Sequence, residues 1–307
     1  MRTVLVVGGT GLIGQETVSR LSENTHAYKV ISFGHHKNFE CLSYAGDVTD
    51  FDTLELVYKK HCPDVTLIMY GLSSIACSYD SRRYVLNDFF GVLNILRCCE
   101  KYGCGKVVYL SSAAVYSGGE RISENHEIFP RSFYAKIKIS MEKILEMYRV
   151  AGILNYVVLR CFNVVGGNGI RAGRDIISIM SREKSVRVFG TSFSTPDGTL
   201  IRDYVYIGDV ASAVERALEF NGSGTFNIGT GVGYSVLEVI SVFQKITGAR
   251  IEILNEARRS FDPEILVADV SRAERILHWS PEYSLVDSVE EIVRKKSSGR
   301  AIFSNMS

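Results

Sequence analysis

The sequence predicts an α/β fold: a doubly wound parallel sheet followed by a smaller α/β lobe at the C-terminus. Three observations support this prediction. Short apolar runs alternate with helical patterns through the first half of the chain, the runs are rich in Val, Ile, Leu or Tyr, and the first of them leads into a glycine-rich turn. Short apolar runs of this kind are typical of strands buried on both faces, and helical crossovers between them favour a parallel sheet.

The first half of the chain contains the predicted sheet and the helices that cover it. Strands are expected at Thr3–Val7, Lys29–Phe33, Val65–Tyr70, Lys106–Ser111 and Tyr156–Cys161. Helical patterns lie between them at Gly11–Ser22, Asp52–His61, Tyr84–Tyr102 and Phe133–Ala151. Because each helix connects two strands, the order predicts right-handed βαβ units.

The second half of the chain changes pattern after Asn163, and it predicts a smaller lobe. Gly166–Gly173 is rich in glycine and is expected to be a loop. Helices are predicted at Arg174–Glu183, Gly208–Phe220, Ser235–Thr247 and Leu285–Lys296. Strands are predicted at Ser185–Phe189, Leu200–Ile207, Gly224–Ile228 and Arg250–Leu254.

The composition excludes several classes of function. The chain has 307 residues, and 35 Lys and Arg residues balance 34 Asp and Glu residues, so bulk charge attracts neither nucleic acid nor an anionic membrane. No apolar stretch approaches the roughly 18 residues that span a bilayer, and the N-terminal run is too short for a signal peptide. The seven cysteines form no CxxC pair, which favours reduced thiols in the cytoplasm over disulfides or a metal site.

A glycine-rich turn follows the first strand, with Gly8, Gly11 and Gly14 at a GxxGxxG spacing. Glycines let the backbone turn sharply and let a pyrophosphate approach the chain, and the helix that follows offers free N–H groups at its N-terminus. The turn therefore predicts a dinucleotide site. The segment Gly46-Asp47-Val48 resembles an adenine-binding turn.

The second strand leaves the choice of dinucleotide open. NAD sites usually end this strand with an acid that binds the adenosine 2′-hydroxyl, but here Gly34 and basic residues follow the strand. NAD and NADP both remain open at this point, because a 2′-phosphate would suit the side chains of Ser32, His35, His36 and Lys37.

A proton-transfer pair is predicted on the helix that begins near Phe133. Tyr134 and Lys138 are four residues apart, so they share one helix face. A free tyrosine has a pKa of about 10, and a neighbouring ammonium lowers it toward neutrality. Ser112 ends a strand at the ligand-binding edge of the sheet, where its hydroxyl can hold a substrate oxygen beside Tyr134.

The order of glycine loop, strand-end serine and YxxxK resembles the extended short-chain dehydrogenase/reductase family, whose cofactor domain has the Rossmann fold. Four later segments are similar to the UDP-galactose (UDP-glucose) 4-epimerase group within it. They are the RxFNxxG segment Arg160–Gly166, the DGTxxRDY segment Asp197–Tyr204, the NxGxGxGxS segment Asn227–Ser235 and the Arg–Asp pair in Arg258–Asp262.

The resemblance implies a division of labour between two domains and a set of site residues. Residues 1–165 with 203–230 are expected to bind the dinucleotide, and residues 166–202 with 231–307 the nucleotide sugar. The implied cofactor contacts are Gly8, Gly11, Leu12, Ile13, Gly14, Asp47, Val48, Tyr70, Gly71, Leu72, Asn87, Ser111, Tyr134, Lys138 and Cys161. The implied substrate contacts are Ser112, Tyr134, Asn163, Arg202, Arg259 and Asp262, with Tyr116 in the sugar pocket and Leu266 near the position that limits sugar size.

The resemblance also implies a reaction and an assembly. Ser112 is followed by Ala113 and Ala114, so no carboxylate is placed for elimination chemistry. We therefore expect NAD-dependent inversion of carbon 4 of a UDP-hexose, with Ser112, Tyr134 and Lys138 as the catalytic residues. An NADPH-dependent 4-keto-sugar reductase and a dinucleotide sensor without turnover are the alternatives. Family members pair two helices with those of a second copy, which implies a homodimer.

Overall fold

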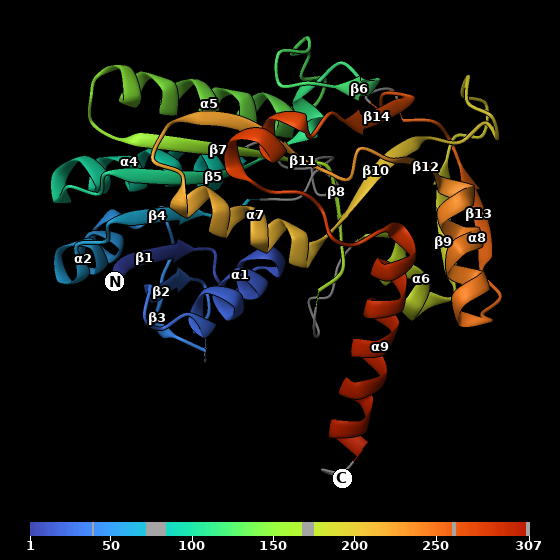
Figure 1. The fold of residues 1–307 in the computed structure, drawn as a ribbon, viewed down its shortest axis with the longest axis horizontal. Coiled ribbons are helices and arrows are strands. Elements are labelled where there is room, and N and C mark those ends of the chain that lie inside the picture. The colour runs from blue at the N-terminus through green and yellow to red at the C-terminus, as the bar shows by residue number, and fades with distance from the viewer. Residues whose placement is uncertain (39, 72–83, 168–174, 260–261, 305–307) are drawn as a thin grey trace. The chain divides into compact units, whose positions relative to one another are not determined.

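The computed structural model describes residues 1–38, 40–71, 84–167, 175–259 and 262–304. The chain forms two compact units. The first comprises Met1–Ser117, Glu127–Arg160 and Ala211–Phe226, and the second Gly118–His126, Cys161–Val210 and Asn227–Ser307. Figure 1 shows the course of the chain from blue to red. What each unit binds stays a prediction.

A seven-stranded sheet forms the centre of the α/β fold. Its order is β11-β7-β5-β4-β1-β2-β3, and β1 pairs in parallel with both β2 and β4. The strands are β1 (Arg2–Val7), β2 (Tyr28–Gly34), β3 (Leu42–Ala45), β4 (Val65–Ile68), β5 (Lys106–Ser112), β7 (Asn155–Cys161) and β11 (Gly224–Ile228). This order confirms the predicted doubly wound sheet, because the chain runs outward in one direction from β1 to β3 and in the other from β4.

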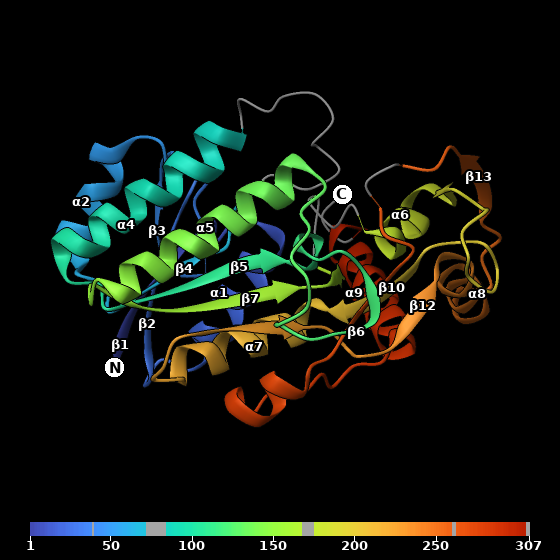
Figure 2. The ribbon, with the colours of Figure 1, turned by 90° about the horizontal axis from the view of Figure 1, so that it is seen from above.

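Helices cover both faces of this sheet. Figure 2 shows α2 (Phe51–His61), α4 (Gly91–Tyr102) and α5 (Phe133–Val150) on one face, and α1 (Leu12–Glu23) and α7 (Ile207–Glu219) on the other. Ion pairs join neighbours on each face: Arg20 of α1 with Glu215 of α7 at 2.7 Å, and Lys101 of α4 with Glu55 of α2 at 2.5 Å. Such exposed pairs add little stability, so apolar burial holds the layers together.

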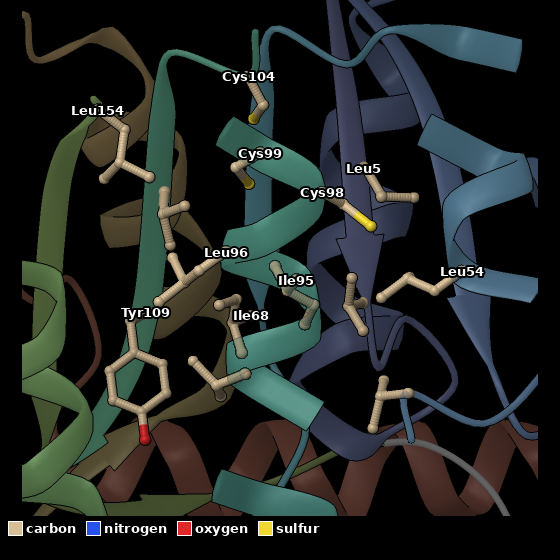
Figure 3. Packing of buried hydrophobic residues seen from close by; sticks show 14 of the residues in the cluster. Leu5, Leu54, Ile68, Ile95, Leu96, Cys98, Cys99, Cys104, Tyr109 and Leu154 are labelled. Carbon is tan, nitrogen blue, oxygen red and sulfur yellow. The ribbon is translucent and has the colours of Figure 1, made fainter. Parts of the chain in front are cut away.

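The core lies between the sheet and the α2–α4 layer. Figure 3 shows Leu54 of α2 and Leu96 of α4 beside strand residues such as Ile68, all of them inaccessible to solvent. Cys99 of α4 lies in the same cluster and is free, as are the other five cysteines among the described residues; Cys77 lies outside them. The Tyr58 hydroxyl also enters this core, where it hydrogen-bonds Thr66 Oγ1 at 2.8 Å and so leaves no buried polar group unpaired at that point.

The second unit contains a five-stranded sheet and a two-stranded sheet. The first runs β12-β10-β14-β6, with β8 also paired to β10, and the second joins β13 to β9. The strands are β6 (Gly119–Ile122), β8 (Asn163–Val165), β9 (Ser185–Phe189), β10 (Ile201–Tyr206), β12 (Gly233–Ser235), β13 (Glu252–Glu256) and β14 (Ile265–Ala268). Its helices include α6 (Ile176–Glu183), α8 (Val236–Thr247), the π-helical turn η4 (Ala273–Leu277) and α9 (Leu285–Ser304). Among the described residues, no helix combines the length and apolar character that crossing a bilayer requires.

Several predicted boundaries differ from the structure. The helix predicted at Tyr84–Tyr102 begins as a π-helical segment, η2 (Tyr84–Phe90), and becomes α-helical only from Gly91. A Cβ atom on Gly91 would lie 2.5 Å from Val48 Cγ2, so the helix approaches its neighbours closely there. The strand expected at Arg250–Leu254 lies two residues later, the strand expected to reach Tyr70 ends at Ile68, and the last helix continues to Ser304.

Five short strands were not predicted: β3, β6, β8, β12 and β14. Each has only three or four residues, too few to show a hydrophobic period. They exist because they pair with longer strands, as β8 and β12 do with β10. Most of the loop expected at Gly166–Gly173 lies outside the described residues.

Candidate active site

The carboxyl ends of β1 and β4 form the topological switch point of the seven-stranded sheet. In open α/β sheets ligands bind in the crevice at such a point. The chain leaves β1 at Gly8 and β4 at Met69, and a Cβ atom on Gly8 would lie only 2.7 Å from the Tyr70 backbone nitrogen. The glycine turn and the segment after β4 therefore border the same crevice.

The glycine turn has the geometry that a pyrophosphate requires. Gly8 has φ +89°, and its carbonyl accepts a hydrogen bond from the Gly11 N–H at 2.9 Å. A Cβ atom on Gly14 would lie 2.8 Å from the Gly9 Cα, so only glycine lets α1 pack this tightly against the turn. No side chain caps α1, and the N–H groups of Leu12 and Ile13 have no acceptor within the helix. This cradle fits a dinucleotide phosphate.

Asp47 and Val48 follow β3 beside the same edge of the sheet. Asp47 accepts hydrogen bonds from the Thr49 N–H at 2.8 Å and from the Thr49 hydroxyl at 2.7 Å. Burial raises the pKa of this carboxyl, but the two bonds from Thr49 outweigh that effect and hold it below its usual value. Asp47 is therefore a carboxylate at neutral pH. Val48 is buried, and its carbonyl accepts from Asn94 at 2.9 Å.

The segment after β4 brings a buried carboxylate that the sequence prediction missed. Among the described residues, the Tyr70 hydroxyl is buried and has no hydrogen-bond partner. Asn87, the predicted contact, donates to Asp88 at 2.9 Å, and it is Asp88 that is buried. A Cβ atom on Gly71 would lie 3.4 Å from Asp88 Oδ2 and 3.3 Å from Lys138 Nζ. Leu72 lies outside the described residues.

Tyr134 and Lys138 lie on one face of α5, as their spacing predicts. Ser132 caps the helix by accepting the Ala135 N–H at 3.1 Å, which places Tyr134 in the first turn. Tyr134 is half-buried, whereas Lys138 is buried and its Nζ lies 5.7 Å from the Tyr134 ring centre. Lys138 also donates to the Leu110 carbonyl at 2.9 Å and sits 4.7 Å from the ring centre of Tyr109. Contacts with β5 thus hold the Lys138 ammonium of α5 beside Tyr134.

A buried polar network supports the strand that carries the serines. Glu142, one turn after Lys138, accepts from Ser111 and forms an ion pair with Arg160 at 2.6 Å. Arg160 also donates to the Tyr116 hydroxyl at 2.8 Å. Tyr116, predicted to line the sugar pocket, is therefore a buried member of this network. The network ties β5, β7 and α5 together, and neither Glu142 nor Arg160 was assigned a role from the sequence.

Ser112 is separate from this network. It is half-buried at the end of β5, and its Oγ accepts the Ala114 N–H at 3.2 Å, which caps a short 3₁₀ turn. The hydroxyl hydrogen remains available for a second acceptor, since capping uses only the oxygen lone pair. Ser112 thus has the chemistry to donate to a substrate oxygen.

Three of the predicted substrate residues, Arg202, Arg259 and Asp262, lie together in the second unit. Arg259 Nε lies 2.7 Å from Asp262, and Arg202 approaches the same carboxylate at 3.9 Å. Arg202 is buried and donates to the Ile201 carbonyl at 2.8 Å; burial lowers its pKa, which Asp262 only partly offsets. The structure therefore brings Arg202, Arg259 and Asp262 together. Asp262 was expected to contact the substrate, and its carboxylate is engaged by the two arginines.

The remaining predicted residues of the second unit lie in three strands. Cys161 is buried at the end of β7, and Asn163 is exposed in β8, where it lies opposite Tyr204 in the strand register. Leu266, expected near the sugar, is buried in β14 opposite Arg202. The structure thus places Leu266 next to the arginine cluster along β10.

The buried Asp203 side chain joins two of the sequence motifs, DGTxxRDY and NxGxGxGxS, by hydrogen bonds. Its buried carboxylate accepts from the Thr230 N–H and hydroxyl, both at 2.7 Å, and from the Gly231 N–H at 2.9 Å. A fourth bond comes from the Ala268 N–H at 3.2 Å. Burial raises the pKa of Asp203, and these four donors oppose the shift. Asp203 of the DGTxxRDY segment thus holds the NxGxGxGxS loop in place beside Arg202.

Comparisons with known proteins show the family and the fold. The model of the NAD dependent epimerase/dehydratase family matches residues 4–229. The chain is 32% identical to the UDP-glucose 4-epimerase of Lacticaseibacillus casei, covering 94% of this chain and 95% of that protein, and 33% identical to that of Halalkalibacterium halodurans, covering 94% and 93%. The UDP-glucose 4-epimerase of Bifidobacterium longum, solved in complex with NAD+ and UDP, superposes with a TM-score of 0.88 at 30% identity, covering 96% and 98%. The chain belongs to the NAD dependent epimerase/dehydratase family.

Proposed function

We propose that this protein is an NAD-dependent epimerase that inverts carbon 4 of a UDP-hexose of the glucose/galactose type. The observation that carries the proposal is the arrangement of Tyr134 and Lys138 on one face of α5, with Lys138 held by Leu110 at the end of β5. Relatives named UDP-glucose 4-epimerase match nearly the whole chain, which supports the same reaction.

Tyr134 is the proton acceptor and donor in this proposal. The Lys138 ammonium favours the phenolate form of Tyr134, which then removes the proton from the sugar 4-hydroxyl and later returns it to the carbonyl oxygen. Ser112 donates a hydrogen bond to the same oxygen and keeps it within reach of Tyr134. NAD, when bound, supplies hydride transfer at carbon 4.

The crevice at the switch point supports a set of proposed contacts with the dinucleotide. Gly8, Gly11 and Gly14, with the N–H groups of Leu12 and Ile13, would hold the pyrophosphate. Asp47 and Val48 would face the adenine, and Lys138 would also hold the nicotinamide ribose. The other proposed contacts are Tyr70, Gly71, Leu72, Asn87, Ser111, Tyr134 and Cys161. Asp88, buried close to Lys138, joins this set.

The substrate diphosphate is assigned to the arginine cluster of the second unit. Arg202 and Arg259 present planar guanidinium donors, which suit phosphate oxygens. Asn163 would contact the nucleotide diphosphate as well, and Asp262 would orient the arginines and the ribose. The proposed domain roles follow: residues 1–165 with 203–230 for the dinucleotide, and 166–202 with 231–307 for the nucleotide sugar.

Assembly and location complete the proposal. A homodimer is supported by apolar side chains on the outer face of α5, where Met147 is 68% exposed and Val150 is 74% exposed. Pairing of α4 and α5 with a second copy would cover them. A cytoplasmic location is supported by the free thiols of the described cysteines. Sedimentation of wild type and Met147→Lys would test the dimer.

One alternative has a specific observation behind it. β2 ends at Gly34 without an acid, as NADPH-dependent reductases of 4-keto sugars would allow. Bound NAD at one equivalent with interconversion of UDP-galactose and UDP-glucose supports the epimerase. Stoichiometric NADPH oxidation by a nucleotide 4-keto sugar supports the reductase, and dinucleotide binding without turnover supports a sensor. Mass spectrometry of the purified protein and a coupled assay decide among them.

Replacing the proposed base gives the sharpest test of the mechanism. Tyr134→Phe removes the only oxygen of that side chain, so turnover should fall by about 10²–10⁴-fold, the usual contribution of general acid–base catalysis. Bound dinucleotide, measured by absorbance, should remain. Tyr148→Phe on the same helix is the matched control and should keep its turnover. Near-normal turnover of Tyr134→Phe would refute the assignment.

A further inference from the structure

The end of β2 lies against the glycine turn. The Gly8 N–H donates to the Phe33 carbonyl at 2.8 Å, and a Cβ atom on Gly34 would lie 3.9 Å from the Gly8 Cα. Gly34 therefore borders the proposed dinucleotide cradle. In sites that select NAD, the residue at the end of the second strand is an Asp or Glu that binds the adenosine 2′-hydroxyl.

The fold does not require glycine at position 34. Gly34 is absent from the glycines with positive φ, so its backbone conformation suits any L-residue. The nearest atom to a Cβ on Gly34 would be Thr10 Oγ1 at 3.4 Å, an ordinary van der Waals contact. An acid would thus fit at position 34 without strain. The residue there is nevertheless glycine, which has no side chain. The carboxylate that would repel a 2′-phosphate is missing where it could have stood.

Three basic side chains replace it. His35, His36 and Lys37 follow Gly34 directly, and all three are exposed. The next residue, Asn38, is buried and anchors this turn, because its side-chain amide donates to the Gly9 carbonyl at 3.0 Å and its backbone N–H donates to Ser43 Oγ at 2.8 Å. The basic residues are therefore tied to the glycine turn itself rather than to a distant loop.

Two acids lie near these basic residues. Asp47 Oδ1 accepts two hydrogen bonds from Thr49 and its carboxylate interacts electrostatically with His35, while Glu40 is exposed beyond Asn38. The three residues that follow Gly34 offer a phosphate one ammonium and two imidazoles. Ammonium and imidazole N–H groups form charge-assisted hydrogen bonds with phosphate oxygens.

We propose that the adenosine end of this site accepts a 2′-phosphate, so that the protein binds NADP with an affinity comparable to that for NAD. The inference rests on the proposed function in that both dinucleotides occupy the same cradle. It names Gly34, His35, His36 and Lys37 as the residues that set cofactor selectivity. The acid that usually discriminates against the 2′-phosphate of NADP is absent at position 34. The family reaction therefore does not restrict the chain to NAD.

An exchange competition measures this selectivity directly. The purified full-length protein is incubated with equal concentrations of NAD and NADP, in excess, until the bound ratio no longer changes. Free nucleotide is removed, the protein is denatured, and the released nucleotides are quantified by mass spectrometry. A bound NADP:NAD ratio between about 0.1 and 10, within tenfold of parity, is expected for the wild type. Fluorescence titration with NADH and NADPH gives an independent ratio.

Two variants should lower the bound NADP:NAD ratio by different means. Gly34→Asp should lower the bound NADP:NAD ratio at least tenfold, through repulsion of the 2′-phosphate and a new bond to the 2′-hydroxyl. The combined variant His35→Gln, His36→Gln, Lys37→Gln should also lower the ratio, and less so as salt is raised, because its effect is electrostatic. Lys59→Gln, an exposed lysine of α2, is the matched control and should leave the ratio unchanged.

The outcomes separate this inference from the proposed function. NAD retained alone by the wild type would overturn the inference and leave the proposed function intact. Retention of neither nucleotide would overturn both. An unchanged ratio in Gly34→Asp, with wild-type thermal unfolding to show that the variant folds, would remove Gly34 from the selectivity set.

Discussion

Arg160 in the first unit and Arg202 in the second are equally buried, with exposed fractions of 6% and 7%, but their surroundings differ. Arg160 meets Glu142 at 2.6 Å and the Tyr116 hydroxyl at 2.8 Å. Arg202 donates to backbone carbonyls, and its carboxylate partner among the described residues, Asp262, lies at 3.9 Å. Burial alone lowers the pKa of both groups; Glu142 and Tyr116 more than reverse this for Arg160, whereas Arg202 stays below its usual value.

The difference separates an arginine whose charge is fully paired within the fold from one whose pairing is incomplete. Moving a charge out of water is costly unless close partners replace the lost hydration. Arg160 finds those partners within its own unit, so its charge serves to join α5 to β7. Arg202 lacks an equally close carboxylate, and an anionic ligand would supply what is missing. A buried arginine therefore indicates a ligand site only when the fold leaves its pairing incomplete.

The largest expected effect is on stability, from breaking the complete pair. Arg160→Met leaves Glu142 buried without its cation, and such a loss typically costs about 3–5 kcal/mol. The double variant with Glu142→Leu should recover part of that loss, because no charge then remains alone. Urea unfolding of wild type, Arg160→Met, Glu142→Leu and the double variant measures the coupling. Glu146→Gln, which affects a neighbouring bond from Tyr156 at 2.5 Å, is the control. A loss no larger than that of the control would contradict the comparison.

The second effect concerns binding and should leave stability nearly intact. Arg202→Met removes charge-assisted hydrogen bonds worth about 1.5–3 kcal/mol, so the Kd for UDP should rise about tenfold to hundredfold. Calorimetric titration with UDP measures the change. Its free energy of unfolding should fall less than that of Arg160→Met, since Arg202 pairs incompletely. If UDP binds Arg202→Met as tightly as wild type, Arg202 is not a diphosphate residue.

The smallest effect extends the comparison to a third cation, the partly buried Lys106. Lys106 donates to the carbonyls of Leu218 and Phe220, and burial lowers its pKa to about 8. Between the folded pKa and the unfolded value near 10.5 the unfolded chain binds more protons, so this group makes stability rise with pH from 8 to 10.5. The free energy of unfolding of Lys106→Met, measured against pH beside wild type, should lack that rise.

Lys101 provides the control with the opposite sign. It pairs with Glu55, which raises its pKa above the usual value, so its contribution is constant below pH 10.5. Lys101→Met should therefore keep the wild-type slope between pH 8 and 10.5. Parallel slopes for all three proteins would show that Lys106 is not desolvated in solution.

Much of the first unit could be predicted because its signals are local. The predicted strands and helices of the sheet correspond to observed elements within a few residues, and the YxxxK spacing placed Tyr134 and Lys138 on one helix face. The glycine spacing predicted a turn that the structure places at the switch point. In these cases the deciding neighbours lie within one turn or one βα connection of each other.

The site was only partly predictable, because several of its residues carry no pattern. Asp88 follows the predicted Asn87 by one position, in the π-helical segment, and its carboxylate lies 3.4 Å from where a Cβ on Gly71 would be. Glu142 continues the Tyr134–Lys138 spacing by one more turn, a signal that could have been used. Asp203 sits inside a recognised segment, yet its four donors come from other elements.

The sequence by itself determined the α/β class, the glycine turn, the helix that carries Tyr134 and Lys138 on one face, and the absence of an acid at the end of β2. These depend on periodicity and on residues close together in the chain. Only the tertiary structure decided which charges are satisfied: Glu142 meets Arg160 from 18 residues away, and Asp203 meets Thr230 from 27. The physical reason is that the cost of a buried charge depends on partners that folding brings together, and a linear pattern does not record them.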